Sequence, residues 1–431
     1  MGEMGRVTKQ IIIGIIAMSL TTPVWAAQAA VEPPAPAEAV TLQSLIDEAL
    51  RINPAIQAKK RMYESARARV VAAWLPDDPM IGMDVEGQSA LFRFDRTDNE
   101  YMAQQTVPFP TTLWLRGRAA AEDAQKAYQE YKEKERDVIW HLEKPYYELF
   151  LARKTLIALE ETQVLADRLS HAVQARYESN QAAQQDLLKA RIESSKIGLE
   201  RFAQRERAHL AEAHISHLLN RSLAERYMSI EETRSGALVT TLEAMEQLAI
   251  KTRPELKAME IGIRRAKTAK WLERTRWLPE ITGRIEARQF SGESNIREYD
   301  TFLGLSVPVW SVIKGISGEW KGAGKDVEAA EATYAEMKNE VLLAVHEAYS
   351  KVITAQNAVM TYEAVILPQA KQQVEVALSA YEAGRSDVLS LVDAQRMLKD
   401  AQVAYYGFLA DYEIGLSDLR LAIGSNWSQQ K

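Results

Sequence analysis

The chain has 431 residues, of which 47% are hydrophobic and 26% are charged, a balance typical of an ordered protein with a buried core. It contains no cysteine, which excludes disulfide frameworks, thiolate metal sites, thiol nucleophiles and attachment of a lipid through cysteine. The formal net charge is −6 and no long block of lysine and arginine is present, so the sequence lacks the basic footprint of a nucleic-acid-binding protein.

The N-terminus has the pattern of a secretory signal peptide. Arg6 and Lys9 precede an apolar run at 11–20, and small residues stand where cleavage after Ala26 requires them. The run is shorter than the roughly 20 apolar residues of a membrane-spanning helix. We therefore expect residues 1–26 to be a signal peptide that is removed on export, and residues 27–40, which are rich in alanine and proline, to be a flexible leader.

The remaining sequence contains one unit twice. The run from Thr41-Leu42 to Asn53-Pro54 matches the run from Thr241-Leu242 to Arg253-Pro254 at an offset of 200 residues. The match resumes at Trp74-Leu75-Pro76 and Trp277-Leu278-Pro279, with three residues inserted. A duplication of this length is typical of two structural repeats on a shared core or in a pseudo-symmetric ring. The sequence predicts a first repeat at 41–220, an inter-repeat equatorial segment at 221–240, a second repeat at 241–424 and a C-terminal tail at 425–431.

Each repeat is predicted to begin with two short helices and a β-hairpin. The first helix breaks before Pro54 or Pro254, and proline suits the first turn of the helix that follows. Apolar and polar residues then alternate along two strands, near 79–109 in the first repeat and near 280–309 in the second. The pattern gives each hairpin one apolar face, which fits either a strand pair in lipid or a half-buried hairpin of a soluble domain.

A long helix is predicted after each hairpin. The stretches 116–178 and 318–382 are rich in alanine, glutamate, lysine, glutamine and leucine, and each would form a helix of on the order of 60 residues, about 90 Å long. Returning helices are expected at 184–219 and 387–421. Pro145 and Pro368 are expected to kink the long helices. Helices of this length exceed a compact globular domain, so we expect antiparallel hairpins that pack side by side.

Four amphipathic strands are too few to close a membrane barrel, because the smallest single-chain barrels have about eight strands and an open edge in lipid leaves backbone groups unpaired. If the strands span a membrane, the chain must therefore oligomerise. The residue pattern alone does not distinguish a dimer from a trimer.

This order of elements resembles the TolC family of outer-membrane efflux proteins. The resemblance is carried by Leu75-Pro76-Asp77-Asp78-Pro79 before the first strand, by Val107-Pro108-Phe109-Pro110 after the second, and by the run from Leu367 through Tyr381-Glu382-Ala383-Gly384 to Asp393-Ala394-Gln395. The proline-flanked strand borders are most similar to the heavy-metal cation efflux branch. Some family members are lipoproteins anchored through an N-terminal cysteine, and this sequence departs from them.

The resemblance implies a mainly α-helical tandem-repeat protomer with long helical hairpins and four transmembrane β-strands. Three protomers would form a 12-stranded β-barrel in the outer membrane, continued by an α-helical barrel in the periplasm. The implied partners are two further copies of the chain, a periplasmic adaptor (membrane fusion protein), an inner-membrane RND-type pump and outer-membrane lipid.

The resemblance also implies a gate at the periplasmic end, with candidate residues Tyr381, Asp393, Asp186, Asp387 and Ser390. Asp186 falls where the family carries the carboxylate that bonds the gate tyrosine, and Asp393 where it carries one ring aspartate. The second ring position falls on Ser390, which predicts a less acidic gate. A ring of carboxylates concentrates negative potential and favours cations. Alternatively, Asp186 and Asp387 only cap exposed N–H groups at a helix turn.

The turns of the two helical hairpins are candidates for adaptor docking. Gly384 and Asn180 stand where a helix commonly ends in a left-handed residue. By resemblance, adaptor hairpins engage these turns, so Asn180, Gln181, Gly384 and Arg385 are the docking candidates.

The histidines offer only a weak metal-site candidate. His214 and His217 are three residues apart on one predicted helix face, and imidazole binds transition metals. Only Glu212 stands at a spacing that could complete a ligand set, so a solvated helix surface is the favoured interpretation. Met83 shares the apolar strand face of Ile81 and Val85, and we expect it to face lipid.

No nucleotide-binding glycine loop, Ser/His/Asp signature or paired-carboxylate pocket is recognisable, so we expect neither an enzyme nor a resident cofactor. The predicted function is that of an outer-membrane channel, the exit duct of a tripartite efflux pump. Its cargo would be heavy-metal cations, or alternatively drugs, dyes or organic solutes. The alternative function is that of a soluble periplasmic coiled-coil adaptor or structural protein.

Overall fold

The computed structural model describes residues 41–86, 98–179, 183–224, 236–293, 295–383, 385–386 and 388–425. The expected signal peptide and leader, most of the inter-repeat segment, nearly all of the tail, and Asn180, Gln181, Gly384 and Asp387 lie outside the described residues. Residues from Ala39 onward form one compact unit, and that unit alone is described below. Within the described residues, none of the helices combines the length and the apolarity needed to cross a membrane.

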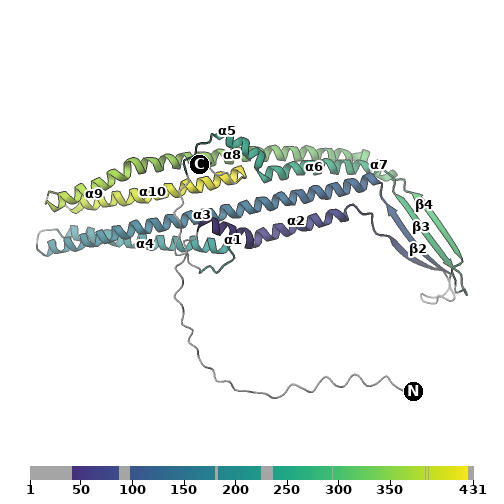
Figure 1. The fold of residues 1–431 in the computed structure, drawn as a ribbon, viewed down its shortest axis with the longest axis horizontal. Helices are drawn as coiled ribbons and strands as arrows, with labels where there is room; N and C mark the ends of the chain where they lie inside the picture. The colour runs from purple at the N-terminus through teal and green to yellow at the C-terminus, as the bar shows by residue number, and fades with distance from the viewer. Residues whose placement is uncertain are drawn as a thin grey trace, which may run out of the picture. The chain divides into compact units, whose positions relative to one another are not determined.

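Both repeats follow the order of two short helices, two strands and a long helical hairpin, and in the second repeat the first long helix is divided by two π-helical turns (Figure 1). The first repeat contains α1 (Leu42–Ile52), α2 (Pro54–Ala72), β1 (Met80–Glu86), β2 (Asp98–Val107), α3 (Pro110–Glu178) and α4 (Gln184–Leu218). The second repeat contains α5 (Leu242–Thr252), α6 (Pro254–Thr275), β3 (Ile281–Gln289), β4 (Glu298–Leu305), α7 (Val309–Lys314), the π-helical turn η1 (Gly315–Glu319), α8 (Trp320–Thr361), the π-helical turn η2 (Tyr362–Ile366), α9 (Leu367–Glu382) and α10 (Val388–Ile423).

The break between the two short helices is fixed in each repeat by a different side chain at the same position. In the first repeat, the Asn53 side chain accepts hydrogen bonds from the N–H groups of Ala55 and Ile56 and donates to the carbonyl of Leu218 at 2.8 Å. In the second repeat, Arg253 donates from Nη1 to the carbonyl of Ala422 at 3.1 Å. Both residues therefore tie the proline break to the C-terminal end of the returning helix.

The long helices form a layer whose order follows from their contacts. The central helix α3 packs against α2 and α4 and also against α6 and α10. In turn, α6 and α10 pack against α8. The layer thus ends with α2 and α4 at one border and with α8 and α9 at the other.

Each repeat has its own apolar core near the short helices. In the first, Leu142, Leu149 and Ala152 of α3 pack with α1, α2 and α4. In the second, Val345, Val352 and Ala355 occupy the equivalent places in α8. Together with Val341, Ala348 and Val359, which are also buried, these residues recur at the alternating three- and four-residue spacing of a coiled-coil seam.

A buried polar cluster joins the two repeats at the level of these cores. The carboxylate of Glu143 in α3 accepts hydrogen bonds from the Ser417 hydroxyl and from Nη1 of Arg420, both in α10. Glu143 and Ser417 are buried, so the charge of Glu143 is matched inside the layer rather than by solvent.

The two prolines of the long helices act differently. α3 continues through Pro145 as one helix, and the kink expected there stays a prediction. Before Pro368, the helix widens into the π-helical turn η2, so the regular α-helical geometry is interrupted where the sequence predicted a distortion. α3 also begins earlier than predicted, at Pro110 rather than near Arg116, because Pro110 occupies the first turn, where a missing N–H costs nothing.

The four strands form one antiparallel sheet in the order β1-β2-β3-β4. The central pair joins the repeats, with Val107 opposite Ile281 and Asn99 opposite Gln289. Among the described strands, β1 and β4 each pair on one side only. The sheet therefore has two open edges, one contributed by each repeat.

Candidate functional site: the sheet and the helical tip

The register of the sheet places apolar residues of all four strands on one face. Rows across the strands include Ile81–Ala103–Ile285–Thr301 and Met83–Tyr101–Ala287–Tyr299. Their large side chains are exposed, and Leu303 in β4 is 80% exposed. A contiguous exposed apolar surface of this kind marks contact with lipid or with another protein. Met83 lies on this face, whereas Met80 and Met102 lie on the other.

The opposite face of the sheet is charged and mainly acidic. One row reads Asp84–Glu100–Arg288–Glu298, and the next carries Glu286 opposite Asp300. The carboxylates that the register assigns to this face, among residues whose side chains are described, are Asp84, Asp98, Glu100, Glu286, Glu298 and Asp300, against the guanidinium groups of Arg284 and Arg288. A closed sheet with this face inward would enclose a polar, electronegative passage.

The two edge strands of the sheet are connected in sequence to helices at the two borders of the helical layer. β1 follows α2 directly, and β4 leads through α7 into α8, so the open strands adjoin the border helices. The border helix α4 also carries a stripe of exposed apolar residues at helical spacing: Leu188, Ile192, Leu199, Phe202 and Leu210. The described sheet thus has an unpaired strand edge at each border, and the helical layer has an exposed apolar stripe on the border helix α4.

At the end of the unit away from the sheet, the two helical hairpins pack together. Leu169, Val173 and Leu187 of the first hairpin form one apolar cluster with Ala377, Leu391 and Ala394 of the second. Tyr381 packs against this cluster, and its hydroxyl accepts a hydrogen bond from Nη1 of Arg176 at 3.4 Å. The Arg176 guanidinium also lies 5.7 Å from the centre of the Tyr381 ring. Tyr381 therefore joins the two hairpins within one chain.

The other candidate gate residues that the structure describes lie on α4 and α10. Asp186 lies in the first turn of α4, where its carboxylate suits the N-terminal end of the helix. Asp393 and Ser390 are exposed on α10, and Arg385 is exposed between α9 and α10. Within the described residues of one chain, Asp186 and Tyr381 form no hydrogen bond, and the gate assignment stays a prediction.

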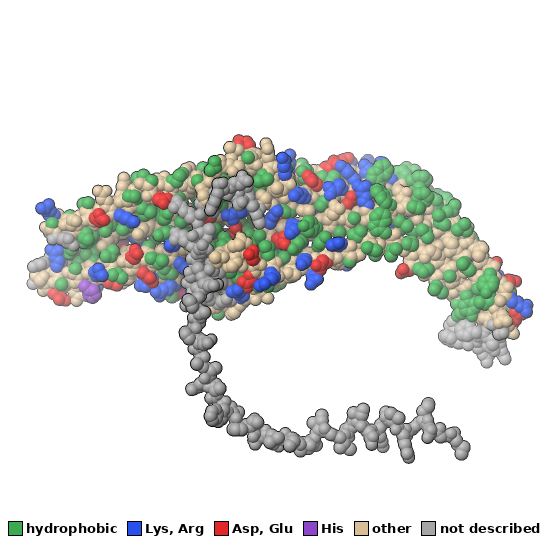
Figure 2. All heavy atoms as spheres, in the orientation of Figure 1, with side chains coloured by type: hydrophobic (Ala, Val, Ile, Leu, Met, Phe, Trp, Pro, Cys, Tyr) green, Lys and Arg blue, Asp and Glu red, His purple; other side chains and the backbone are tan. Residues whose placement is uncertain are grey.

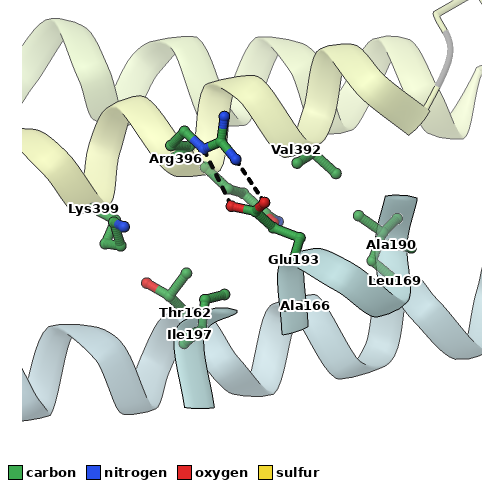
Figure 3. A pocket seen from close by; sticks show the side chains of 10 residues that line it. Thr162, Ala166, Leu169, Ala190, Glu193, Ile197, Val392, Arg396 and Lys399 are labelled. Carbon is green, nitrogen blue, oxygen red and sulfur yellow. Dashed lines mark hydrogen bonds and ion pairs between the residues drawn. The ribbon is translucent and has the colours of Figure 1, made fainter. Parts of the chain in front are cut away.

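Two ion pairs that the sequence did not indicate join the two hairpins on the sheet side of the apolar cluster around Tyr381. Glu193 of α4 accepts two hydrogen bonds from Arg396 of α10, at 3.1 Å from Nε and 2.6 Å from Nη2 (Figure 3). Hydrogen bonding from Arg396 lowers the pKa of Glu193 and raises that of Arg396. Lys399 of α10 donates to Glu200 of α4 at 3.1 Å. These pairs depend on which residues of α4 lie opposite which residues of α10, and the sequence alone does not give this alignment.

The space beside the Glu193–Arg396 pair is small. It measures about 20 Å³ and is lined by apolar residues of α3 and α4 such as Ala166, Leu169 and Ile197. This is about the room that a single water molecule needs. The region is therefore a packed junction between hairpins rather than a pocket for a ligand.

The histidine pair is not assembled into a metal site. His214 and His217 are exposed on α4, whereas the nearby carboxylate of Glu212 is buried and accepts from Nη2 of Arg153 at 2.9 Å. Among the described residues, no group of three or more His, Cys, Asp or Glu side chains is placed to hold a metal ion.

Comparison with known proteins gives concordant matches. Residues 246–425 match the family model described as outer membrane efflux protein. The chain is 24% identical over 343 residues to outer membrane protein TolC of Vibrio cholerae, covering 74% of each protein. It is 21% identical over 272 residues to the cobalt-zinc-cadmium resistance protein CzcC of Cupriavidus metallidurans, covering 61% of this chain and 62% of the relative.

Solved structures show the same fold. The CusC channel superposes with a TM-score of 0.79 at 14% identity, covering 90% of this chain and 93% of CusC. The CmeC outer membrane channel of Campylobacter jejuni gives a TM-score of 0.76 at 15% identity, covering 90% of this chain and 87% of CmeC. The predicted fold of the protomer, long helical hairpins with a four-stranded β-sheet in a tandem repeat, is confirmed.

Proposed function

We propose that the chain is a member of the TolC family of outer-membrane efflux proteins and that three copies close into the exit duct of a tripartite efflux pump. The chain is an outer-membrane efflux channel that extends into the periplasm. In the proposal, an inner-membrane RND-type transporter and a periplasmic adaptor hand over the substrate, which the duct conducts passively. Outer-membrane lipid surrounds the sheet.

The observation that supports this proposal best is the coincidence of open edges in the sheet and in the helical layer. Strand β4 of one copy can pair with β1 of the next, while α8 and α9 cover the apolar stripe on α4 of the same neighbour. Such a head-to-tail interface closes into a ring when the rotation per copy divides the circle. Closure removes the strand edges, which lipid does not tolerate. The apolar face then faces lipid and the acidic face the passage.

The mass of the extracted particle tests this assembly. Outer membranes of cells that express the chain are dissolved in mild detergent, and light scattering with the detergent subtracted gives the protein mass. Three times the mass of the mature subunit is expected. Recovery as a monomer or dimer in water without detergent would overturn the duct and favour the alternative, a soluble periplasmic coiled-coil adaptor or structural protein.

Heavy-metal cations are the proposed cargo. The acidic sheet face supports this assignment, since repeated carboxylates attract cations. The name of the relative CzcC adds support, because it describes resistance to cobalt, zinc and cadmium. Cells whose own duct is deleted should regain tolerance to these metals when the chain is supplied. Restored tolerance only to dyes or drugs would assign the duct to organic solutes.

The proposed gate is formed by Tyr381, Asp393, Asp186, Asp387 and Ser390 at the periplasmic tip. The contact between Tyr381 and Arg176 supports it, because it joins the two hairpins that must separate for the tip to widen. Tyr381→Phe is expected to raise the single-channel conductance at the resting state, and Asp393→Asn to lower the preference for cations. Unchanged conductance and selectivity in both variants would remove these residues from the gate.

Adaptor docking is proposed at the hairpin turns, through Asn180, Gln181, Gly384 and Arg385. Arg385 is exposed at the end of α9, where a partner can reach it. Arg385→Asp should abolish metal tolerance while leaving the particle mass and conductance unchanged. Full tolerance in this variant would exclude Arg385 from the docking surface.

A further inference from the structure

Tryptophan is concentrated where the helices meet the sheet. Six of the nine tryptophans lie there: Trp74, Trp114, Trp271, Trp277, Trp310 and Trp320. Figure 2 shows hydrophobic side chains gathered at this junction and continuing over the sheet. Tryptophan prefers the level of lipid headgroups, because its ring is largely apolar while its N–H remains hydrated.

The two repeats place their tryptophans differently at this junction. In the first repeat, Trp74 packs on Gly117 so closely that a Cβ there would come within 2.2 Å of the indole. In the second repeat, the corresponding flat surface on Gly315 is occupied by Trp320, and a Cβ there would lie 2.4 Å from that ring. Trp277, which the duplication aligns with Trp74, is 54% exposed. Trp74 itself is 44% exposed, so both repeats keep a partly exposed indole at this level.

The segment between β4 and α8 exposes apolar side chains more widely than the start of α3 does, where Phe109 is 37% and Trp114 46% exposed. In the first repeat α3 runs on from Pro110 as one helix, whereas in the second repeat the corresponding stretch is divided into α7, the π-helical turn η1 and α8. Val309, Trp310, Ile313 and Ile316 recur at the spacing of one helix face, with Trp310 75% and Ile316 71% exposed. Gly315, on the other side, is buried under Trp320. The segment is therefore a short amphipathic element with its apolar side outward.

Two cations flank this apolar side. Lys314 ends α7 and Lys321 follows at the start of α8, and both are exposed. Neither lysine forms an ion pair with another described residue. Apolar side chains next to free lysines match the layer of a bilayer in which acyl chains meet phosphates.

We propose that Val309–Glu319 is an interfacial anchor, one per copy, that lies in the periplasmic leaflet of the outer membrane. Its apolar side enters the boundary between headgroups and acyl chains, and Lys314 and Lys321 bind phospholipid phosphates. The inference rests on the membrane-spanning position of the sheet, since the segment continues directly from β4. A neighbouring copy of the chain is the competing occupant of this surface.

Depth-dependent quenching tests the anchor, and the absence of native cysteine allows single-cysteine labelling of the full chain. Ile316→Cys reports on the anchor, Leu303→Cys on the apolar sheet face, and Ser350→Cys, exposed on α8, serves as the control outside the membrane. Each variant carries an environment-sensitive dye and is reconstituted in phosphatidylethanolamine and phosphatidylglycerol vesicles that contain lipids brominated at shallow or deep acyl positions.

The label at Ile316 should be quenched about twofold more by shallow than by deep bromines, as expected for an interfacial position. The label at Leu303 should be quenched most by deep bromines and the label at Ser350 by neither. Quenching at Leu303 without quenching at Ile316 would overturn the anchor, assign its apolar side to a neighbouring copy, and leave the duct intact. No quenching at Leu303 would overturn the membrane position of the sheet and the anchor with it.

The phosphate contacts have a separate test. In the Ile316→Cys background, raising the phosphatidylglycerol content should shift the dye emission to the blue. Lys314→Gln with Lys321→Gln should suppress this shift, whereas Lys371→Gln, exposed on α9, should not. An equal shift in all three proteins would remove the lysines from the anchor.

Discussion

Removing the guanidinium of Arg396 should loosen the contact between the two helical hairpins. The pair that Arg396 forms with Glu193 is bidentate and charge-assisted, which makes it stronger than a typical surface pair. The Arg396 side chain is 46% exposed and that of Glu193 18%, so solvent screening limits the coupling to about 1 kcal/mol per copy. A free-energy change of about 1.4 kcal/mol alters an equilibrium ratio tenfold, so a loss of about 1 kcal/mol in Arg396→Gln should raise the population of separated hairpins about fivefold per copy.

Single-channel recording in planar bilayers measures this population as the fraction of time spent in conducting states. A double-mutant cycle with Glu193→Gln isolates the coupling between the two side chains. Arg201→Gln is the matched control, because Arg201 pairs with Glu160 at 3.3 Å within the first hairpin and does not bridge the hairpins. The control should leave the conducting fraction unchanged.

Two results would refute this reasoning. A coupling energy near zero would mean that the pair adds nothing to the junction between α4 and α10. Equal effects of Arg396→Gln and Arg201→Gln would mean that a general loss of helix stability, rather than separation of the hairpins, governs conduction.

Three further predictions concern pH, membrane insertion and stability. The hydrogen bonds from Arg396 lower the pKa of Glu193 in the folded protein, so the pair contributes its full stabilisation above the unfolded pKa of about 4.3. This stabilisation is lost as the pH falls from that value through the lowered folded pKa. The conducting fraction should then rise in the native channel but not in Glu193→Gln. Leu303→Arg, on the apolar face of β4 that we propose to contact lipid, should cost about 2–4 kcal/mol of stability in vesicles measured by urea titration, whereas Asp300→Arg, on the opposite face, should cost far less. Glu143→Ala leaves the Arg420 guanidinium without its buried partner and should destabilise the protein by about 3 kcal/mol, seen as a lower melting temperature; an unchanged melting temperature would show that solvent reaches the cluster.

The features repeated in both halves of the chain could be predicted from the sequence. The breaks at Pro54 and Pro254, the returning helices and the alternating strands depend on local rules, namely proline geometry and hydrophobic periodicity. The apolar face of each hairpin followed from the same alternation, whereas the acidic character of the opposite face was not predicted. Their alignment into continuous rows depended on the pairing register, which the structure supplies.

The features that depend on contacts between distant helices could not be predicted. The Glu193–Arg396 and Glu143–Arg420 pairs join residues about 200 or more positions apart, and no local pattern marks them. The sequence also missed α7 and η1, because the long helix of the second repeat was predicted only from residue 318 onward. At Pro145, the fully buried Leu142, Tyr146 and Leu149 favour continuation of the helix despite a local cost of about 3 kcal/mol.

The pairing of β2 with β3 determines the order in which the molecule can assemble. Val107 and Ile281 face each other across the sheet although 174 residues separate them, so the first hairpin emerges from export long before its neighbour exists. During that interval its apolar face has no partner, and a two-stranded hairpin is marginally stable alone. Contacts so distant in sequence form slowly. Periplasmic chaperones that shield isolated strands should therefore govern the yield of this protein more strongly than the stability of its finished form.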